Sequence, residues 1–75
     1  MTIQDQIEQM ETKAQALELY KLITQNPDAR IEDFTNWAGF QRQTYYDWDN
    51  PLPDKTRFQL YGRLTKLLKE TTHAK

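Results

Sequence analysis

The sequence contains no cysteine and a single histidine, His73. The absence of thiols excludes disulfide bonds, thiolate metal sites and a cysteine nucleophile, and one histidine cannot hold a metal ion by itself. No apolar stretch reaches the ~18 residues that a membrane span needs, and residues 1–10 lack the basic start and apolar run of a signal peptide. These absences predict a protein of the reducing cytoplasm, with no metal, cofactor or membrane partner.

Groups arranged for catalysis are equally scarce. Asp47 and Asp49 flank Trp48, and residues two apart on a helix do not share a face. The sequence shows no glycine-rich phosphate loop and no Ser/His/Asp set. A chain of 75 residues also lacks the walls of the usual ligand pocket, which is ~300 Å³ or larger. We therefore expect neither an enzyme nor a small-molecule ligand.

The charges that are present divide the chain into two halves. Residues 1–40 carry three cations and seven carboxylates (net −4), and residues 41–75 carry seven cations and four carboxylates (net +3). An acidic N-terminal half and a basic C-terminal half suit a protein that offers one face to a polyanion. Ordinary mixed surface charge would give the same count.

The spacing of apolar residues predicts four helical segments and no strand. They are residues 2–24, residues 31–38 (beginning at Ile31 or Glu32), residues 42–49, and a last helix capped by Asp54 that runs to about Glu70. Pro27, Gly39 and the Pro51–Pro53 segment separate them. The expected fold is all-α, a small four- to five-helix domain over residues 1–75, with residues 1–12 as an N-terminal helical extension. The buried stripe expected on the last helix is Phe58, Tyr61, Leu64, Leu67 and Leu68.

The apolar stripe of the first segment allows two interpretations. Ile3, Ile7, Met10, Ala14 and Leu17 recur at spacings of four and three. Such a stripe is either a seam between two chains of a homodimer or the inner face of one long helix. Whether residues 1–12 are ordered stays open at this level.

The most informative stretch is two short helices joined by a turn at Gly39, which is the physical content of a helix-turn-helix. Phe34, Trp37 and Ala38 lie on the inner face of the first helix, and Phe40 fills the turn. Tyr45 and Trp48 anchor the second helix inward. The side chains left to solvent are Gln41, Arg42, Gln43, Thr44, Tyr46 and Asp47.

The segment Gly39–Trp48 resembles the turn and recognition helix of helix-turn-helix DNA-binding regulators of the phage Cro/repressor type. Gly39, Thr44 and Trp48 are the specific matches, and the resemblance extends over about residues 12–70. The sequence departs from the family pattern at Thr35, where alanine is usual because two helices approach closely. It also departs at Gln41, a poor helix cap, and at Asp47, where a cation is common.

The resemblance implies that the helix beginning at Arg42 enters the major groove of double-stranded DNA. Gln41 and Gln43 would read adenine, Arg42 a guanine or phosphate, and Asp47 a cytosine amino group. Thr44 and Tyr46 would add contacts to bases or phosphates. Lys55 and Arg57 would hold the DNA backbone. Each of these side chains also has a plainer interpretation as a solvated surface residue.

Two functions therefore remain open. The first is a sequence-specific transcriptional regulator, such as a repressor of phage or mobile-element type, that acts as a homodimer on an inverted repeat. The second is a protein-interaction module on the same scaffold, such as a phage-encoded inhibitor or adaptor of a host protein. The acidic N-terminal half and Asp47 favour the second, and the Gly39–Trp48 pattern favours the first.

Overall fold

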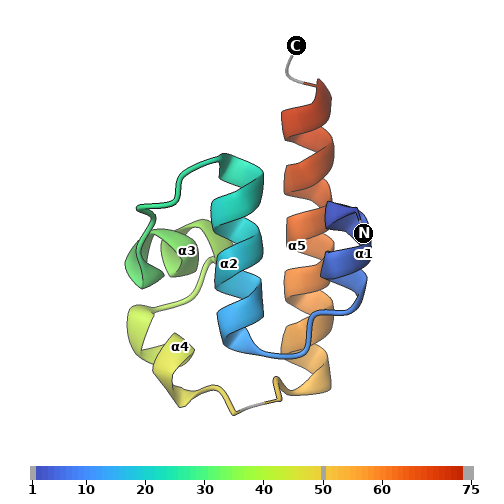
Figure 1. Ribbon diagram of the computed structural model, residues 1–75. Coiled ribbons are helices and arrows are strands. Elements are labelled where there is room, and N and C mark those ends of the chain that lie inside the picture. The colour runs from blue at the N-terminus through green and yellow to red at the C-terminus, as the bar shows by residue number, and fades with distance from the viewer. Residues whose placement is uncertain (1, 50, 74–75) are drawn as a thin grey trace.

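The structure, a computed structural model, describes residues 2–49 and 51–73 and is all-α over those ranges. The helices are α1 (Ile3–Glu8), α2 (Lys13–Thr24), α3 (Ile31–Ala38), α4 (Arg42–Asp47) and α5 (Asp54–His73) (Figure 1). The fold class predicted from apolar spacing is confirmed. None of these helices is long and apolar enough to cross a membrane.

The prediction of a single helix over residues 2–24 is wrong, because the helical structure is interrupted between α1 and α2. The Thr12 hydroxyl accepts a hydrogen bond from the Gln15 backbone N–H at 3.2 Å. The Gln15 side-chain oxygen in turn accepts from the backbone N–H groups of Glu11 at 2.8 Å and Thr12 at 3.0 Å. This reciprocal cap starts a new helix at Lys13 without any glycine or proline.

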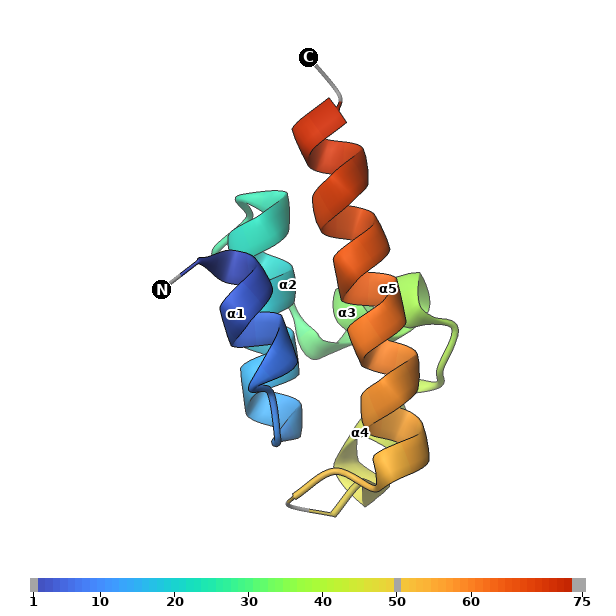
Figure 2. The same ribbon diagram turned by 90° about the vertical axis from the view of Figure 1, so that its right-hand side faces the viewer.

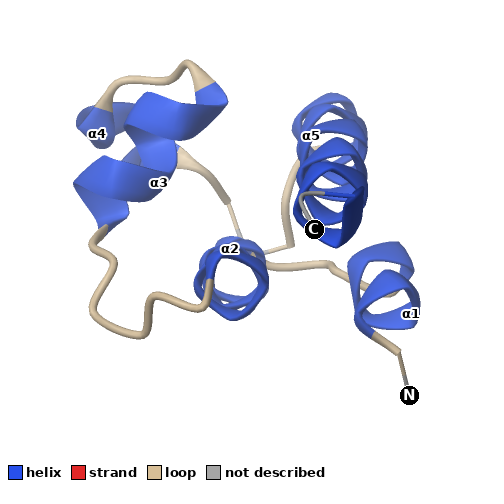
Figure 3. Ribbon diagram, turned by 90° about the horizontal axis from the view of Figure 1, so that it is seen from above, coloured by secondary structure: helices blue, strands red, loops and turns tan. Residues whose placement is uncertain are grey.

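The helices form two groups, seen from above in Figure 3. α5 packs against α1 and α2, and α3 and α4 pack together beside α2. Ile7 and Met10 of the N-terminal stripe are buried, so this part of the stripe packs within the chain. Ala14, from the same stripe, is exposed. The most deeply buried apolar side chains are Ile7, Met10, Ala16, Phe34, Ala38, Leu60 and Leu64.

The stripe expected on α5 is wrong at Phe58, whose exposed fraction is 68%. Leu60 and Leu64, both fully buried, centre the inner face of α5, and Phe58 lies away from it. Tyr61, Leu67 and Leu68 are half-buried against the core. The last helix also runs to His73, beyond the expected Glu70, and Asp54 is its first residue rather than a preceding cap.

The connection from α4 to α5 is tied to a segment that is distant in the sequence but close in space. The Leu52 backbone N–H donates to the Glu11 carbonyl at 2.8 Å, and the Leu52 side chain is buried. This bond joins the α4–α5 loop to the α1–α2 connection. The tie brings the first turn of α5 to the same end of the molecule as α4 (Figures 1 and 2).

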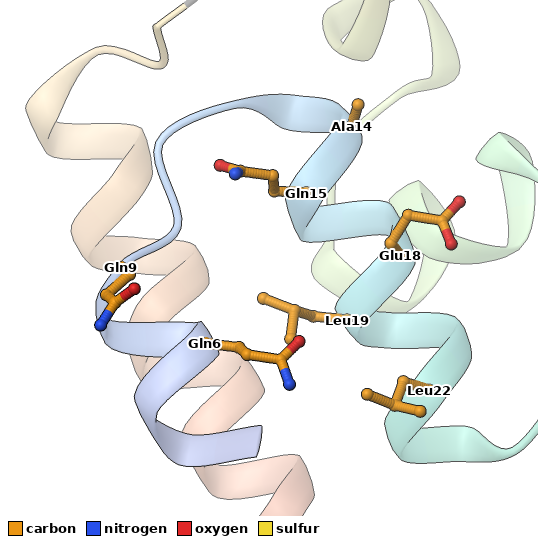
Figure 4. A pocket seen from close by; sticks show the side chains of 7 residues that line it. All are labelled: Gln6, Gln9, Ala14, Gln15, Glu18, Leu19 and Leu22. Carbon is orange, nitrogen blue, oxygen red and sulfur yellow. The ribbon is translucent and has the colours of Figure 1, made fainter. Parts of the chain in front are cut away.

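The surface carries open hollows that are larger than chain length alone led us to expect. One hollow of about 520 Å³ lies between α1 and α2 and is called the α1–α2 groove (Figure 4). Leu19 and Leu22 on α2 and Gln6 on α1 lie on its two sides. The exposed fraction of Leu22 is 48%.

Candidate nucleic-acid interface

The first helix of the predicted helix-turn-helix, α3, has the bounds expected from the sequence. The Asp33 carboxylate accepts from the Arg30 backbone N–H at 2.9 Å and so satisfies a donor at the positive end of the helix. Phe34 and Ala38 are buried. Thr35 is fully buried too, and its hydroxyl donates to the Glu32 carbonyl at 3.1 Å. This bond satisfies the hydroxyl donor, so threonine can be fully buried at this position.

The turn that follows depends on Gly39, which has a φ of +83° and closes α3 in the left-handed conformation. A side chain at this φ would be strained, so glycine is required here. The Phe40 backbone N–H donates to the Thr35 carbonyl at 2.8 Å. The Phe40 ring meets the Trp48 ring edge-on, with centroids 5.1 Å apart. The turn is thus packed in place by the two aromatic side chains.

The second helix, α4, places most of its polar side chains in solvent. Tyr45 is buried and Trp48 half-buried, as the spacing predicted. Thr44 is also half-buried. The exposed side chains of the segment are Gln41, Arg42, Gln43, Tyr46 and Asp47. The helix ends at Asp47, two residues earlier than expected, because Trp48 has an extended backbone.

Two of the exposed side chains are paired with each other. The Gln43 amide nitrogen donates to the Asp47 carboxylate at 3.1 Å, one helical turn away. The pair leaves the second carboxylate oxygen of Asp47 and the carbonyl oxygen of Gln43 as acceptors. The pair therefore orients the Asp47 carboxylate as a hydrogen-bond acceptor.

The C-terminal end of α4 is held by Lys13, a residue that sequence reasoning missed. The Lys13 ammonium donates to the Trp48 carbonyl at 3.0 Å and to the Tyr46 carbonyl at 3.3 Å. It also lies 5.3 Å from the centroid of the Tyr45 ring. A cation near helix C-terminal carbonyls is favourable, and α4 has no basic residue in its own last turn.

The tyrosines beneath this interface are held in the neutral form. Burial raises the pKa of Tyr45, and the neighbouring Tyr46 and Glu18 raise it further. Burial likewise raises the pKa of Tyr20, with a smaller contribution from Asp33. A phenol is already neutral near pH 7 at its ordinary pKa, so the upward shifts extend that neutrality to higher pH and the rings act as uncharged packing groups.

The two cations expected to hold the DNA backbone point to different places. Lys55 is exposed on the first turn of α5. Arg57 is half-buried, contacts the Asp54 carboxylate at 3.4 Å and lines a hollow with Ile7 and Met10. Arg57 thus faces the side of α5 that carries α1.

Two other cations lie beside the turn, and sequence reasoning missed them as well. The Arg63 guanidinium lies 3.7 Å from where a Cβ on Gly39 would stand. Lys66, almost one turn further along α5, lines a hollow beside the turn together with Gly39 and Arg63. In the sequence they were indicated only by the net positive charge of residues 41–75, and a net charge does not show where an individual side chain points.

Within residues 2–49 and 51–73, no group of three or more acidic, histidine or cysteine side chains could hold a metal ion. No protein-family model, no curated protein and no solved structure matches this chain.

Proposed function

We propose that the protein is a sequence-specific DNA-binding transcriptional regulator that inserts α4 into the major groove. The observation that carries the proposal is the division of α4 into an anchored side and a polar side. Tyr45 packs inward, and five exposed side chains between Gln41 and Asp47 offer hydrogen-bonding groups. A major groove about 12 Å wide admits such a helix and presents base edges to it.

Each exposed side chain makes a different kind of contact with the DNA. Arg42 contacts a phosphate or guanine, because a guanidinium matches either one with two parallel hydrogen bonds. Gln41 and Gln43 read adenine, and Tyr46 contacts a thymine methyl or a phosphate. The Gln43–Asp47 pair offers acceptors, so Asp47 suits the amino group of cytosine.

The resemblance to repressors of phage and mobile elements supports this function and implies a cytoplasmic homodimer on an inverted repeat. Two-fold dimers of this kind read half-sites about one helical turn apart. Lys55 would then add a phosphate contact at the end of α5 that lies near α4.

The test is a selection of bound sequences from randomised duplex DNA, followed by affinity measurements on Arg42→Glu. We expect an enriched inverted repeat and a ~10-fold or greater loss of affinity in the variant. Lys69→Glu is the matched control, because Lys69 is exposed near the far end of α5. No enrichment above the input pool, or equal losses in both variants, would contradict the proposal.

The second candidate is the protein-interaction module, and Asp47 together with the exposed Glu32 and Asp33 favours it. Arg42→Glu would then leave partner binding mostly intact while the randomised DNA selection stays empty. The same two measurements therefore separate the two functions.

A further inference from the structure

α5 carries an aromatic side chain, Phe58, that is mostly exposed to solvent. Phe58 has the largest exposed fraction, 68%, among the exposed large hydrophobic side chains of the described residues. Its guanidinium neighbour Arg57 lies on the α1 side, 5.7 Å from the ring centroid. One turn along α5 is Gly62, where an added Cβ would meet no atom within 4 Å. Phe58 thus stands beside open space on the same helix.

That space is a hollow of about 560 Å³ between α5 and the α3–α4 turn, called the α5 groove here. Ala38, Phe40 and Gly62 contribute its apolar lining, and Phe58 lies at its edge, where it also lines the hollow on the α1 side. In Figure 2 the turn runs beside α5 on the side opposite α1. The groove therefore lies between two elements that are both held by the core.

The rim of the α5 groove is basic. Arg63 and Lys66 line the groove and are exposed. Among the described residues, the ion pairs join Lys21 to Glu18 and Arg57 to Asp54, so neither rim cation takes part in one. An apolar lining with two cations at its edge is complementary to an apolar side chain flanked by carboxylates.

We propose that the α5 groove docks an acidic amphipathic segment of a partner protein, with one bulky apolar side chain over Gly62 and carboxylates on Arg63 and Lys66. The mode is an amphipathic segment laid in a groove, with the apolar side chain as its anchor. The exposed Phe58 favours protein over duplex DNA, because charged phosphates dominate the outside of a duplex and its bases are stacked inside. The inference does not depend on DNA binding by α4, because it uses none of the side chains assigned to base reading.

The charge of the rim also argues against a second copy docked through the same face. A two-fold contact would bring the Arg63 and Lys66 side chains of two chains together, and like charges facing each other are unfavourable. The α1–α2 groove differs in charge, since its lining contains Glu18 and no cation. An acidic partner is therefore expected to bind the α5 groove in preference to the α1–α2 groove.

The experiment begins with selection of random linear peptides displayed on phage against the intact protein, and continues with the enriched sequence made as a synthetic peptide. We expect enrichment of carboxylates around a large apolar residue. The chain has only two glycines, Gly39 and Gly62, and both line the groove. In a ¹⁵N-labelled sample their amide signals should therefore shift when the synthetic peptide is added.

Single substitutions test which side chains of the α5 groove contact the synthetic peptide. Phe58→Ser and Arg63→Glu should each weaken binding of the synthetic peptide ~10-fold or more. Leu22→Ser and Arg30→Glu are the matched controls, an exposed apolar residue and an exposed cation away from the groove, and both should bind like the parent. Because Phe58 is exposed, its replacement should leave thermal unfolding nearly unchanged, which a melt of each variant checks.

Four results would overturn the proposal. One is a selection without acidic enrichment, and another is equal peptide affinity in Phe58→Ser and Leu22→Ser. A third is a Gly62 shift on adding duplex DNA in place of the peptide, which would assign the groove to nucleic acid. The fourth is a Gly62 shift that follows protein concentration alone, which would assign it to a second copy of the chain.

Discussion

The two helices of the helix-turn-helix are stabilised in different ways. α3 carries its own N-terminal carboxylate acceptor, ends on a left-handed glycine and buries Phe34, Thr35 and Ala38. α4 has no side-chain cap at its N-terminus and buries only Tyr45 among its six residues. Its C-terminal carbonyls are bound by Lys13 from α2. The ends of α3 are thus determined by residues close to them in the sequence. The stability of α4 depends instead on contacts with residues that are distant in the sequence.

The largest expected effect concerns the anchor of α3. Phe34→Ala should lower the free energy of unfolding by about 3–5 kcal/mol, because the fully buried ring contacts Tyr20, Trp37 and Tyr45 and its removal leaves a cavity. Denaturant unfolding measures the change. Phe58→Ala is the matched control, the same substitution at an exposed ring, and should change the value by about 0.5 kcal/mol or less. Similar losses in both variants would contradict the core assigned to α3.

The same contrast explains how much could be predicted from the sequence. The bounds of α3, the left-handed Gly39 and the inward Tyr45 follow from local signals, and the structure confirms them. The break before Lys13 was missed, because the segment contains no glycine or proline and the Thr12–Gln15 capping box was not considered. Local rules work where a residue interacts with neighbours three or four positions away.

Features that depend on tertiary placement could not be predicted. Phe58 was expected in the buried stripe, yet Leu60 occupies the buried position, because the packing of α5 on α1 and α2 decides which face of the helix turns inward. Arg57 and Arg63 have the same chemistry, and only the structure shows that one faces α1 and the other the turn. Lys13 opens a helix, where a cation is locally unfavourable, and its role appears 33 and 35 residues away.

A smaller effect is expected when the remote support of α4 is removed. Lys13→Met keeps the side-chain length and deletes two hydrogen bonds from a charged donor, so the free energy of unfolding should fall by about 1–3 kcal/mol. Amide hydrogen exchange should show α4 losing more protection than α3. Lys21→Met is the control, because its exposed pair with Glu18 at 3.5 Å contributes about 0–1 kcal/mol. Unchanged protection of α4 amides would show that Lys13 does not hold the helix.

The smallest effect is a gain, and it distinguishes stability from function at the start of α4. Gln41 has the extended backbone of a cap but makes no cap hydrogen bond. Gln41→Ser should therefore raise the free energy of unfolding by about 0.5–1 kcal/mol, measured by denaturant unfolding. Gln43→Ser, inside the helix, should instead lower it slightly by losing the contact with Asp47.

The value of Gln41→Ser lies in measuring DNA affinity on the same sample. If the proposed base contact exists, the variant is more stable and binds the selected duplex less tightly, because serine caps the helix but does not reach a base edge as glutamine does. A variant that is more stable and binds equally well would remove Gln41 from the interface and leave Arg42 and Gln43 as the reading groups. A variant without any gain in stability would mean that the remote contacts of α4, rather than its missing cap, already determine how firmly the helix is held.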